Sequence, residues 1–206
     1  MLKAYVDLQW LNVKVGILFA KLGIPPNTWT VMSLVPALMG FMALYYHNLG
    51  WALVLFVVSG FMDIIDGAVA RVTKCVSNLG AFLDGIIDRY VEIIMYLGIW
   101  YFLQDTQALL IPTAIWTMLL IFGALMPSFV RAYADHREVV TDRDDQRRMG
   151  GLIERFERLT IIYFGMFFSL VYEERILLWA LAVTAVLSNL TAIQRTLFVV
   201  SYSKKK

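Results

Sequence analysis

Long runs without a charged residue constrain this chain more than any other feature of its sequence. Residues 29–62, 106–130 and 176–194 contain no Asp, Glu, Lys or Arg. A helix needs about 20 apolar residues to cross a bilayer, so the first run alone holds one crossing and most of a second. Because 60% of all residues are hydrophobic, the composition also excludes an ordinary soluble globular protein.

We therefore predict an all-α integral membrane protein with six transmembrane helices. Turn-forming or strongly polar segments separate the predicted spans, for example the Gly-Ile-Pro-Pro stretch at 23–26 and the dense charges at 134–150. The predicted spans cover residues 28–46, 51–72, 78–103, 108–133, 151–172 and 176–200.

The two ends of the chain carry basic residues. Residues 1–22 interleave lysines with apolar side chains, which predicts an amphipathic helix along the cytoplasmic membrane surface rather than a cleavable signal peptide. A six-helix domain is expected over 23–200, followed by a basic tail at 201–206. Among the turns of the opposite face only Arg175 is basic, so the positive-inside rule places both termini in the cytoplasm. The single cysteine, Cys75, excludes an internal disulfide.

Four aspartates stand in an otherwise apolar stretch. Asp63 and Asp66 are spaced i,i+3, and Asp84 and Asp88 are spaced i,i+4, so each pair shares one face of a helix. Two antiparallel helices joined near 72–79 would bring all four together. Desolvation and repulsion would then protonate most of them unless divalent cations neutralised the charge. Ligands that are all oxygen suit Mg²⁺, Mn²⁺ or Ca²⁺ rather than zinc. A buried pathway for protons or cations is the alternative.

The pattern Asp63-x2-Asp66-Gly67-x2-Ala70-Arg71-x8-Gly80-x3-Asp84-x3-Asp88 resembles the signature of the CDP-alcohol phosphotransferase family. The resemblance implies a membrane enzyme that acts on a CDP-linked lipid, releases CMP and forms a homodimer. It also implies two metal ions per active site, Mg²⁺ or Mn²⁺, held by Asp63, Asp66, Asp84 and Asp88, with Asp88 as the general base. The residues that the resemblance assigns to the CDP-lipid are Asn27, Thr30, Asp66, Gly67, Ala70, Arg71, Gly80 and Asp84.

Arginines in the second half of the chain indicate the chemistry of the acceptor, the molecule that receives the group transferred from the CDP-lipid. Arg131 ends the fourth predicted span, Arg155 and Arg158 open the fifth, and Arg195 lies late in the sixth. Arginine is well suited to bidentate recognition of phosphate. A cationic pocket beside a CDP-lipid site therefore predicts an acceptor that is itself phosphorylated.

A second resemblance narrows the acceptor. Residues 151–159, GLIERFERL, are similar to the G-I-A-E-R-x-E-R-L element of the branch that makes phosphatidylinositol phosphate or archaetidylinositol phosphate. Ile193-Gln194-Arg195 resembles the V-Q-R element of the same branch. These elements imply transfer of a phosphatidyl-type group from CDP-diacylglycerol or CDP-archaeol to myo-inositol phosphate. Glu154 and Glu157 are expected to pair with the arginines.

Other interpretations remain open from the sequence. Glycerol 3-phosphate as the acceptor would make the protein a phosphatidylglycerophosphate synthase, and CDP-inositol is an alternative donor. Outside the enzymes, the competing hypothesis is a cation or proton transporter. That hypothesis predicts inverted halves and helices broken in mid-membrane, and the sequence has neither. The expected partners are membrane lipids, the two substrates and a second copy of the chain, and nucleic acid is not expected.

Overall fold

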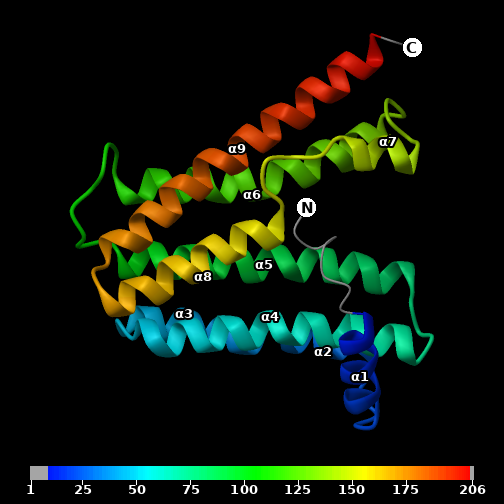
Figure 1. Cartoon of the computed structure of the whole chain (residues 1–206), viewed down its shortest axis with the longest axis horizontal. Coiled ribbons are helices and arrows are strands. Elements are labelled where there is room, and N and C mark those ends of the chain that lie inside the picture. The colour runs from blue at the N-terminus through cyan, green and yellow to red at the C-terminus, as the bar shows by residue number, and fades with distance from the viewer. Residues whose placement is uncertain (1–8, 205–206) are drawn as a thin grey trace. The chain divides into compact units, whose positions relative to one another are not determined.

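The chain is helical throughout its regular structure. The computed structural model describes the backbone of residues 9–204 and the side chains of residues 13–204, and within these residues it contains helices and no strands (Figure 1). The prediction of an all-α protein is therefore confirmed. The chain divides into two compact units, with the division between residues 102 and 103.

The first unit is organised around two long helices that run in opposite directions (Figure 1). A short helix, α2, packs against both of them, and α1 packs across the end of the first long helix. The helices of this unit are α1 (Gln9–Ala20), α2 (Pro26–Met32), α3 (Leu34–Tyr45), α4 (Leu49–Val72) and α5 (Asn78–Phe102).

The first predicted span, 28–46, is interrupted at Ser33, where α2 ends and α3 begins. Pro36 explains the break, because proline has no N–H to continue the helical hydrogen bonds of the preceding turn. Hydroxyl groups bond to backbone carbonyls at the break: Ser33 Oγ donates to Thr30 O at 2.6 Å, and Ser59 Oγ donates to Ser33 O at 2.8 Å. The two helices together are long and apolar enough to form one crossing.

Aromatic side chains gather at the turn between α3 and α4 and at the end of α5. Tyr45 and Tyr101 stack with ring centroids 4.6 Å apart, and His47 lies against Tyr101 and Phe102. His47 has a φ of 55° in this turn, which lies between the predicted spans 28–46 and 51–72. Such amphipathic rings are typical of the boundary between lipid and water. This end of the unit therefore has the composition of a membrane interface.

The second unit consists of a long helix pair and a shorter helix that packs on one member of the pair. α6 and α9 make the most extensive contact, and α8 folds back onto α9 (Figure 1). The helices are α6 (Thr113–His136), α7 (Arg143–Arg148), α8 (Arg155–Val171) and α9 (Arg175–Ser203).

Two helix starts in this unit differ from the sequence prediction. Residues 108–112 are not helical, and α6 begins directly after Pro112, whose missing N–H is harmless only at a helix start. Residues 151–154 are also outside a helix, so α8 is 17 residues long. The left-handed φ of 55° at Gly150 and the φ of 155° at Gly151 end the preceding turn and delay the helix.

The polar connection between α6 and α8 is anchored rather than loose. Val140 and Met149 are buried with Ala134, and Phe198 and Tyr202 of α9 pack against this cluster. Tyr202 also donates its hydroxyl to Asp145 Oδ2 at 2.8 Å. The segment predicted to lie outside the lipid therefore carries a short helix, α7, that is fixed to the end of α9.

Among the residues that the structure describes, four segments are long and apolar enough to cross a membrane: Pro26–Tyr45, Leu49–Val72, Thr113–His136 and Arg175–Ser203. Helix α5 is long enough, but Asp84, Asp88, Arg89 and Glu92 raise its charge, and α8 is one turn short. The structure therefore supports a membrane protein, while the predicted count of six spans is not confirmed by these criteria.

The described part of the N-terminal helix is less polarised than predicted. Residues 1–8 of the predicted segment lie outside the described residues. In α1, Val15 and Phe19 pack inward while Val13, Ile17 and Leu18 are exposed, so apolar side chains occur on both sides. The prediction of an amphipathic helix is not confirmed by the part that the structure describes.

Candidate functional site

Three of the four predicted metal ligands come together in the first unit. Asp63 and Asp66 lie one turn apart on α4, and Asp84 lies near the start of α5. One carboxylate oxygen from each lies within 4.8 Å of those of the other two. Asp66 is buried, whereas the other two are half-buried and accessible from outside. The spacing of the sequence motif is thus realised as a compact group of oxygen ligands.

The donor set fits a hard divalent cation. Three carboxylates at this separation repel one another, and burial of Asp66 adds a desolvation cost. Carboxylate oxygens are the ligands that Mg²⁺ and Mn²⁺ prefer, and the group contains no sulfur or imidazole. Asp63, Asp66 and Asp84 are therefore the residues of this chain that could hold the metal.

Thr30 of α2 orients the buried carboxylate. Its hydroxyl donates to Asp66 Oδ2 at 2.5 Å and also lies 3.3 Å from Pro26 O. Thr30 is itself buried, so its one proton is committed inside the protein. A hydrogen bond to a metal-binding carboxylate fixes its direction. Thr30, predicted to bind the CDP-lipid, therefore contacts a candidate metal ligand in this structure.

Asp88, the predicted base and fourth metal ligand, is not a member of the three-carboxylate group. It follows Asp84 by one helical turn on α5 and is buried. Its Oδ2 lies 3.7 Å from Nη1 of Arg89, which also donates to Gly85 O at 3.0 Å. The role of Asp88 as base and fourth ligand stays a prediction, and the three-carboxylate group is formed without it.

Four of the remaining residues predicted to bind the CDP-lipid approach one another in two pairs. A Cβ built on Gly80 would lie 3.0 Å from Asn27 Oδ1, so the start of α5 approaches the start of α2 closely. A Cβ on Gly67 would lie 3.4 Å from Nη1 of Arg71. Ala70 is half-buried on the same helix. The absence of a side chain at Gly80 leaves room for the amide of Asn27 beside the helix start.

Two polar contacts near the site were not foreseen from the sequence. Ser77 Oγ accepts a hydrogen bond from the Gly80 N–H at 3.0 Å and so stabilises the first turn of α5. Glu92 is almost fully buried, and Tyr96 donates its hydroxyl to Glu92 Oε1 at 3.4 Å. The regular i,i+4 spacing of Glu92 after Asp88 was a signal that could have drawn attention to it.

In the second unit, Arg195 joins three parts of the chain. Its Nε donates to Gly150 O at 2.7 Å, and its Nη1 donates to Pro127 O at 2.8 Å. Its Nη2 lies 3.6 Å from Glu154 Oε1. A guanidinium has five N–H donors, so these contacts do not use them all. Arg195, predicted to bind the acceptor, also connects α9 to α6 and to the start of α8.

Arg131 and Arg158 interact electrostatically with the guanidinium of Arg195. Both repel Arg195 electrostatically, while Glu154 attracts it. Arg158 is buried and Arg131 is half-buried. Two positive charges and one negative charge around a third positive charge leave a net excess that favours a bound anion. The predicted pairing of Glu154 with an arginine is thus found with Arg195.

Local structure at the start of α8 holds these groups. Gly151 needs to be glycine because a Cβ there would lie 2.5 Å from Thr191 Cγ2. Thr191 Oγ1 in turn accepts from the Ile153 N–H at 3.2 Å. Glu157 Oε2 accepts from the Glu154 N–H at 3.1 Å, which caps the helix. Arg155, the first residue of α8, is half-buried beside this cap.

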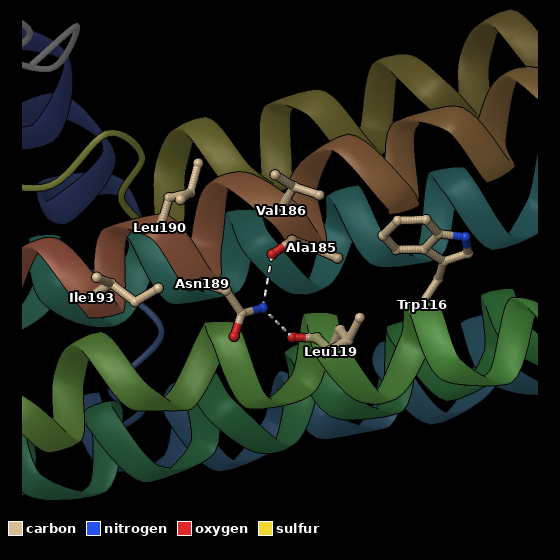
Figure 2. Close-up of a pocket in the computed structure, with 7 residues that line it drawn as sticks. All are labelled: Trp116, Leu119, Ala185, Val186, Asn189, Leu190 and Ile193. Atoms are coloured by element: carbon tan, nitrogen blue, oxygen red, sulfur yellow. Dashed lines mark hydrogen bonds between the residues drawn. The ribbon is translucent and has the colours of Figure 1, made fainter. Parts of the chain in front are cut away.

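The second unit also has an apolar groove between α6 and α9, shown in Figure 2. Its one polar side chain is Asn189, which donates Nδ2 to Leu119 O and to Ala185 O, both at 2.8 Å. The groove therefore has no charged group with which to bind a metal or a diphosphate. It is lined by Trp116, Leu119, Ala185, Val186, Asn189, Leu190 and Ile193.

Sequence comparison relates the chain to one enzyme family. The family model described as CDP-alcohol phosphatidyltransferase matches residues 24–189. An archaetidylinositol phosphate synthase from Pyrococcus horikoshii is 32% identical over 182 residues, covering 88% of this chain and 87% of that protein. A phosphatidylinositol phosphate synthase from Mycolicibacterium smegmatis is 31% identical over 199 residues, covering 91% of this chain and 82% of that protein.

Solved structures show the same fold. The Mycobacterium tuberculosis phosphatidylinositol phosphate synthase in complex with manganese and citrate has a TM-score of 0.78 at 23% identity, covering 92% of this chain and 89% of that one. The same enzyme with CDP-DAG bound has a TM-score of 0.77 at 23% identity, covering 91% and 92%. At this identity, the likeness is one of architecture.

Proposed function

The chain belongs to the CDP-alcohol phosphatidyltransferase family, and on this basis we propose that it transfers a phosphatidyl-type group from a CDP-lipid to inositol phosphate. As a member of this family it is a phosphotransferase. The observation that carries the proposal is the group formed by Asp63, Asp66 and Asp84, since a diphosphate donor needs a divalent cation at this position.

The residues have separate tasks in the reaction. Asp63, Asp66 and Asp84 would hold the metal, and by resemblance Asp88 and a second ion complete the site. Bound cations would neutralise the diphosphate and the charge that develops during transfer. Gly67 and Gly80 would let the nucleotide approach the helix backbone closely, and Asn27, whose Oδ1 lies beside Gly80, would contact it there.

Asp88 is proposed to accept the proton of the attacking hydroxyl. The hydroxyl oxygen bonds to the β-phosphorus of the CDP-lipid, and the bond from this phosphorus to the oxygen bridging it to the α-phosphorus breaks. CMP leaves with that oxygen and its electron pair, and the proton moves to the Asp88 carboxylate. A carboxylate is a suitable base when it is positioned beside the reacting hydroxyl.

Support for a phosphorylated acceptor comes from the arginines of the second unit. Arg131 and Arg158 interact electrostatically with Arg195, and Glu154 forms an ion pair with it. The relatives that are named as phosphatidylinositol or archaetidylinositol phosphate synthases favour inositol phosphate over glycerol 3-phosphate. Arg155 is included in this acceptor site because of its place in the GLIERFERL element.

Replacement of Arg155 tests the acceptor site. We expect Arg155→Ala to raise the KM for inositol phosphate by roughly 10- to 100-fold, because a charge-assisted hydrogen bond contributes about 1.5–3 kcal/mol. The KM for the CDP-lipid should change little. Arg147→Ala is the matched control, since Arg147 is exposed and pairs only at 3.4 Å with Asp144 on the surface of α7. An unchanged acceptor KM in Arg155→Ala would remove this residue from the site.

We further propose that α5 and α8 also cross the bilayer, giving six spans with the aspartates and both termini on the cytoplasmic side. The charges of α5 end at Glu92, so the ten residues that follow are uncharged. Cys75 is exposed in the turn between α4 and α5 and is the only cysteine, so it reports the side of that turn.

A membrane-impermeant maleimide should therefore label Cys75 in inside-out vesicles and not in intact cells. Labelling from outside intact cells would reverse the proposed orientation.

By family resemblance we also propose a homodimer, and a monomeric mass by light scattering of the detergent-solubilised protein would contradict it.

A further inference from the structure

The helix α1 lies before the stretch that matches the family model, yet it packs directly behind the candidate metal site. We propose that α1 is a positioning element for the metal-binding carboxylates and that Gly16 determines its distance from α4. The inference rests on the proposed metal site. It adds to that site a helix that contains none of the motif residues. Figure 1 shows α1 lying across the end of α4 rather than along it.

Gly16 is the point of closest approach between the two helices. A Cβ built on Gly16 would lie 2.6 Å from Ala68 O and 2.6 Å from Val72 Cγ2. The first of these is a backbone atom, so it cannot move aside as the end of a flexible side chain can. Ala68 lies two residues after Asp66 on α4. Any side chain at position 16 would therefore push α1 away from the turn that carries the buried metal ligand.

A second contact of α1 lies next to Thr30, the hydrogen-bond partner of Asp66. Phe19 meets Trp29 of α2 edge-to-face, with ring centroids 5.4 Å apart. Trp29 is buried with Ile65 and Val69 in one apolar cluster, and Val15 and Phe19 of α1 cover this cluster. Trp29 precedes Thr30 and Ile65 precedes Asp66. The hydrogen bond between Thr30 and Asp66 thus lies directly beside the cluster that α1 covers.

Metal affinity is sensitive to small displacements of the residues that support the metal ligands. Supporting groups keep metal ligands within about 0.5 Å of the productive geometry, and loss of an outer contact typically lowers metal affinity about 10- to 100-fold. A displaced α1 would uncover Trp29 and Ile65, and the segments that carry Thr30 and Asp66 would shift. The outer residues Val13, Ile17 and Leu18 are exposed, so they offer no comparable contact within this unit.

The test measures Mn²⁺ binding to the full-length protein in detergent by electron paramagnetic resonance of the free ion. Gly16→Ala should raise the Kd for Mn²⁺ by about 10-fold or more, as expected for loss of an outer support. Two controls should stay within about twofold of wild type: Ile17→Ala, on the exposed side of α1, and Gly165→Ala. Gly165 is packed as tightly as Gly16, since its Cβ would lie 2.5 Å from Ala180 Cβ, but this contact is in the second unit.

Turnover gives a second readout that a purely structural role would not change. CMP release by Gly16→Ala should require more Mn²⁺ and should approach the wild-type kcat when Mn²⁺ is saturating. An unchanged Mn²⁺ affinity with lowered thermal stability would overturn the inference and leave the metal site intact. Absence of Mn²⁺ binding by the wild-type protein would overturn both. If Gly16→Ala does not fold, Phe19→Leu is measured instead, and unchanged Mn²⁺ affinity in it overturns the inference.

Discussion

Asp88→Asn should abolish turnover while leaving both substrates bound, together with the metal at Asp63, Asp66 and Asp84. Asparagine keeps the shape of the side chain but cannot accept the proton of the attacking hydroxyl. Removal of a positioned general base typically costs about 10²- to 10⁴-fold in rate. The three-carboxylate group stays complete in this variant, so Mn²⁺ binding at that group should change much less than kcat. Single-turnover CMP release and equilibrium binding of the CDP-lipid measure the two effects separately.

The matched control for this change is Asp105→Asn, which alters an exposed acid in the loop before α6. It should leave the rate of CMP release unchanged. Full activity of Asp88→Asn would show that another group takes the proton, and Glu92 on the next turn of α5 would then be the first residue to replace.

Asp66→Asn should have an effect of a different kind, because it removes the central and most buried member of the metal group. The amide oxygen is a neutral and weaker ligand, and its hydrogen bond from Thr30 would no longer hold a carboxylate in place. We expect the Kd for Mn²⁺ to rise by at least the roughly 10- to 100-fold that loss of an outer support causes. Activity at ordinary Mg²⁺ concentrations should be lost with it.

Mn²⁺ binding followed by electron paramagnetic resonance measures this directly, without any turnover. Asp144→Asn serves as the control, since Asp144 is exposed on α7 and its ion pair with Arg147 is a surface contact. Wild-type Mn²⁺ affinity in Asp66→Asn would show that the metal is held elsewhere in the chain.

Much of the fold follows from the distribution of charge along the sequence. The charge-free runs contain much of the long apolar helices, and the turns at His47 and Cys75 lie between the spans predicted from them. Helix boundaries at prolines were predicted less well. Pro36 divides the first span and Pro112 precedes α6, because the cost of a proline depends on which carbonyl it leaves without a partner.

In the candidate site too, residue spacing predicts some features, and helix packing determines the others. The i,i+3 spacing of Asp63 and Asp66 placed both on one face, and the structure brings Asp84 to them. Asp88 lies one turn beyond Asp84 on α5, and whether it reaches the same metal position depends on how α5 packs, which spacing alone does not determine. Likewise, the close approach of Gly16 to Ala68 arises where two helices cross, so no local pattern in residues 9–20 predicts it.

Arg195 shows why the role of a residue type cannot be read from its position alone. Its place near the end of the last helix suggested an anion ligand. In the structure its guanidinium also donates to the carbonyls of Gly150 and Pro127. Replacement of Arg195 would thus disturb the packing of α6 and α9 as well as any phosphate contact, which makes Arg155 the cleaner probe of the acceptor.

The most direct test of the central claim is CMP release by the purified protein from CDP-diacylglycerol or CDP-archaeol with Mg²⁺. Inositol 1-phosphate, glycerol 3-phosphate, serine and free inositol are compared as acceptors under the same conditions. We expect turnover with inositol 1-phosphate and none with free inositol or serine, because the arginines of the second unit select a phosphorylated acceptor. CMP release with serine or free inositol but not with inositol 1-phosphate would contradict the proposed function.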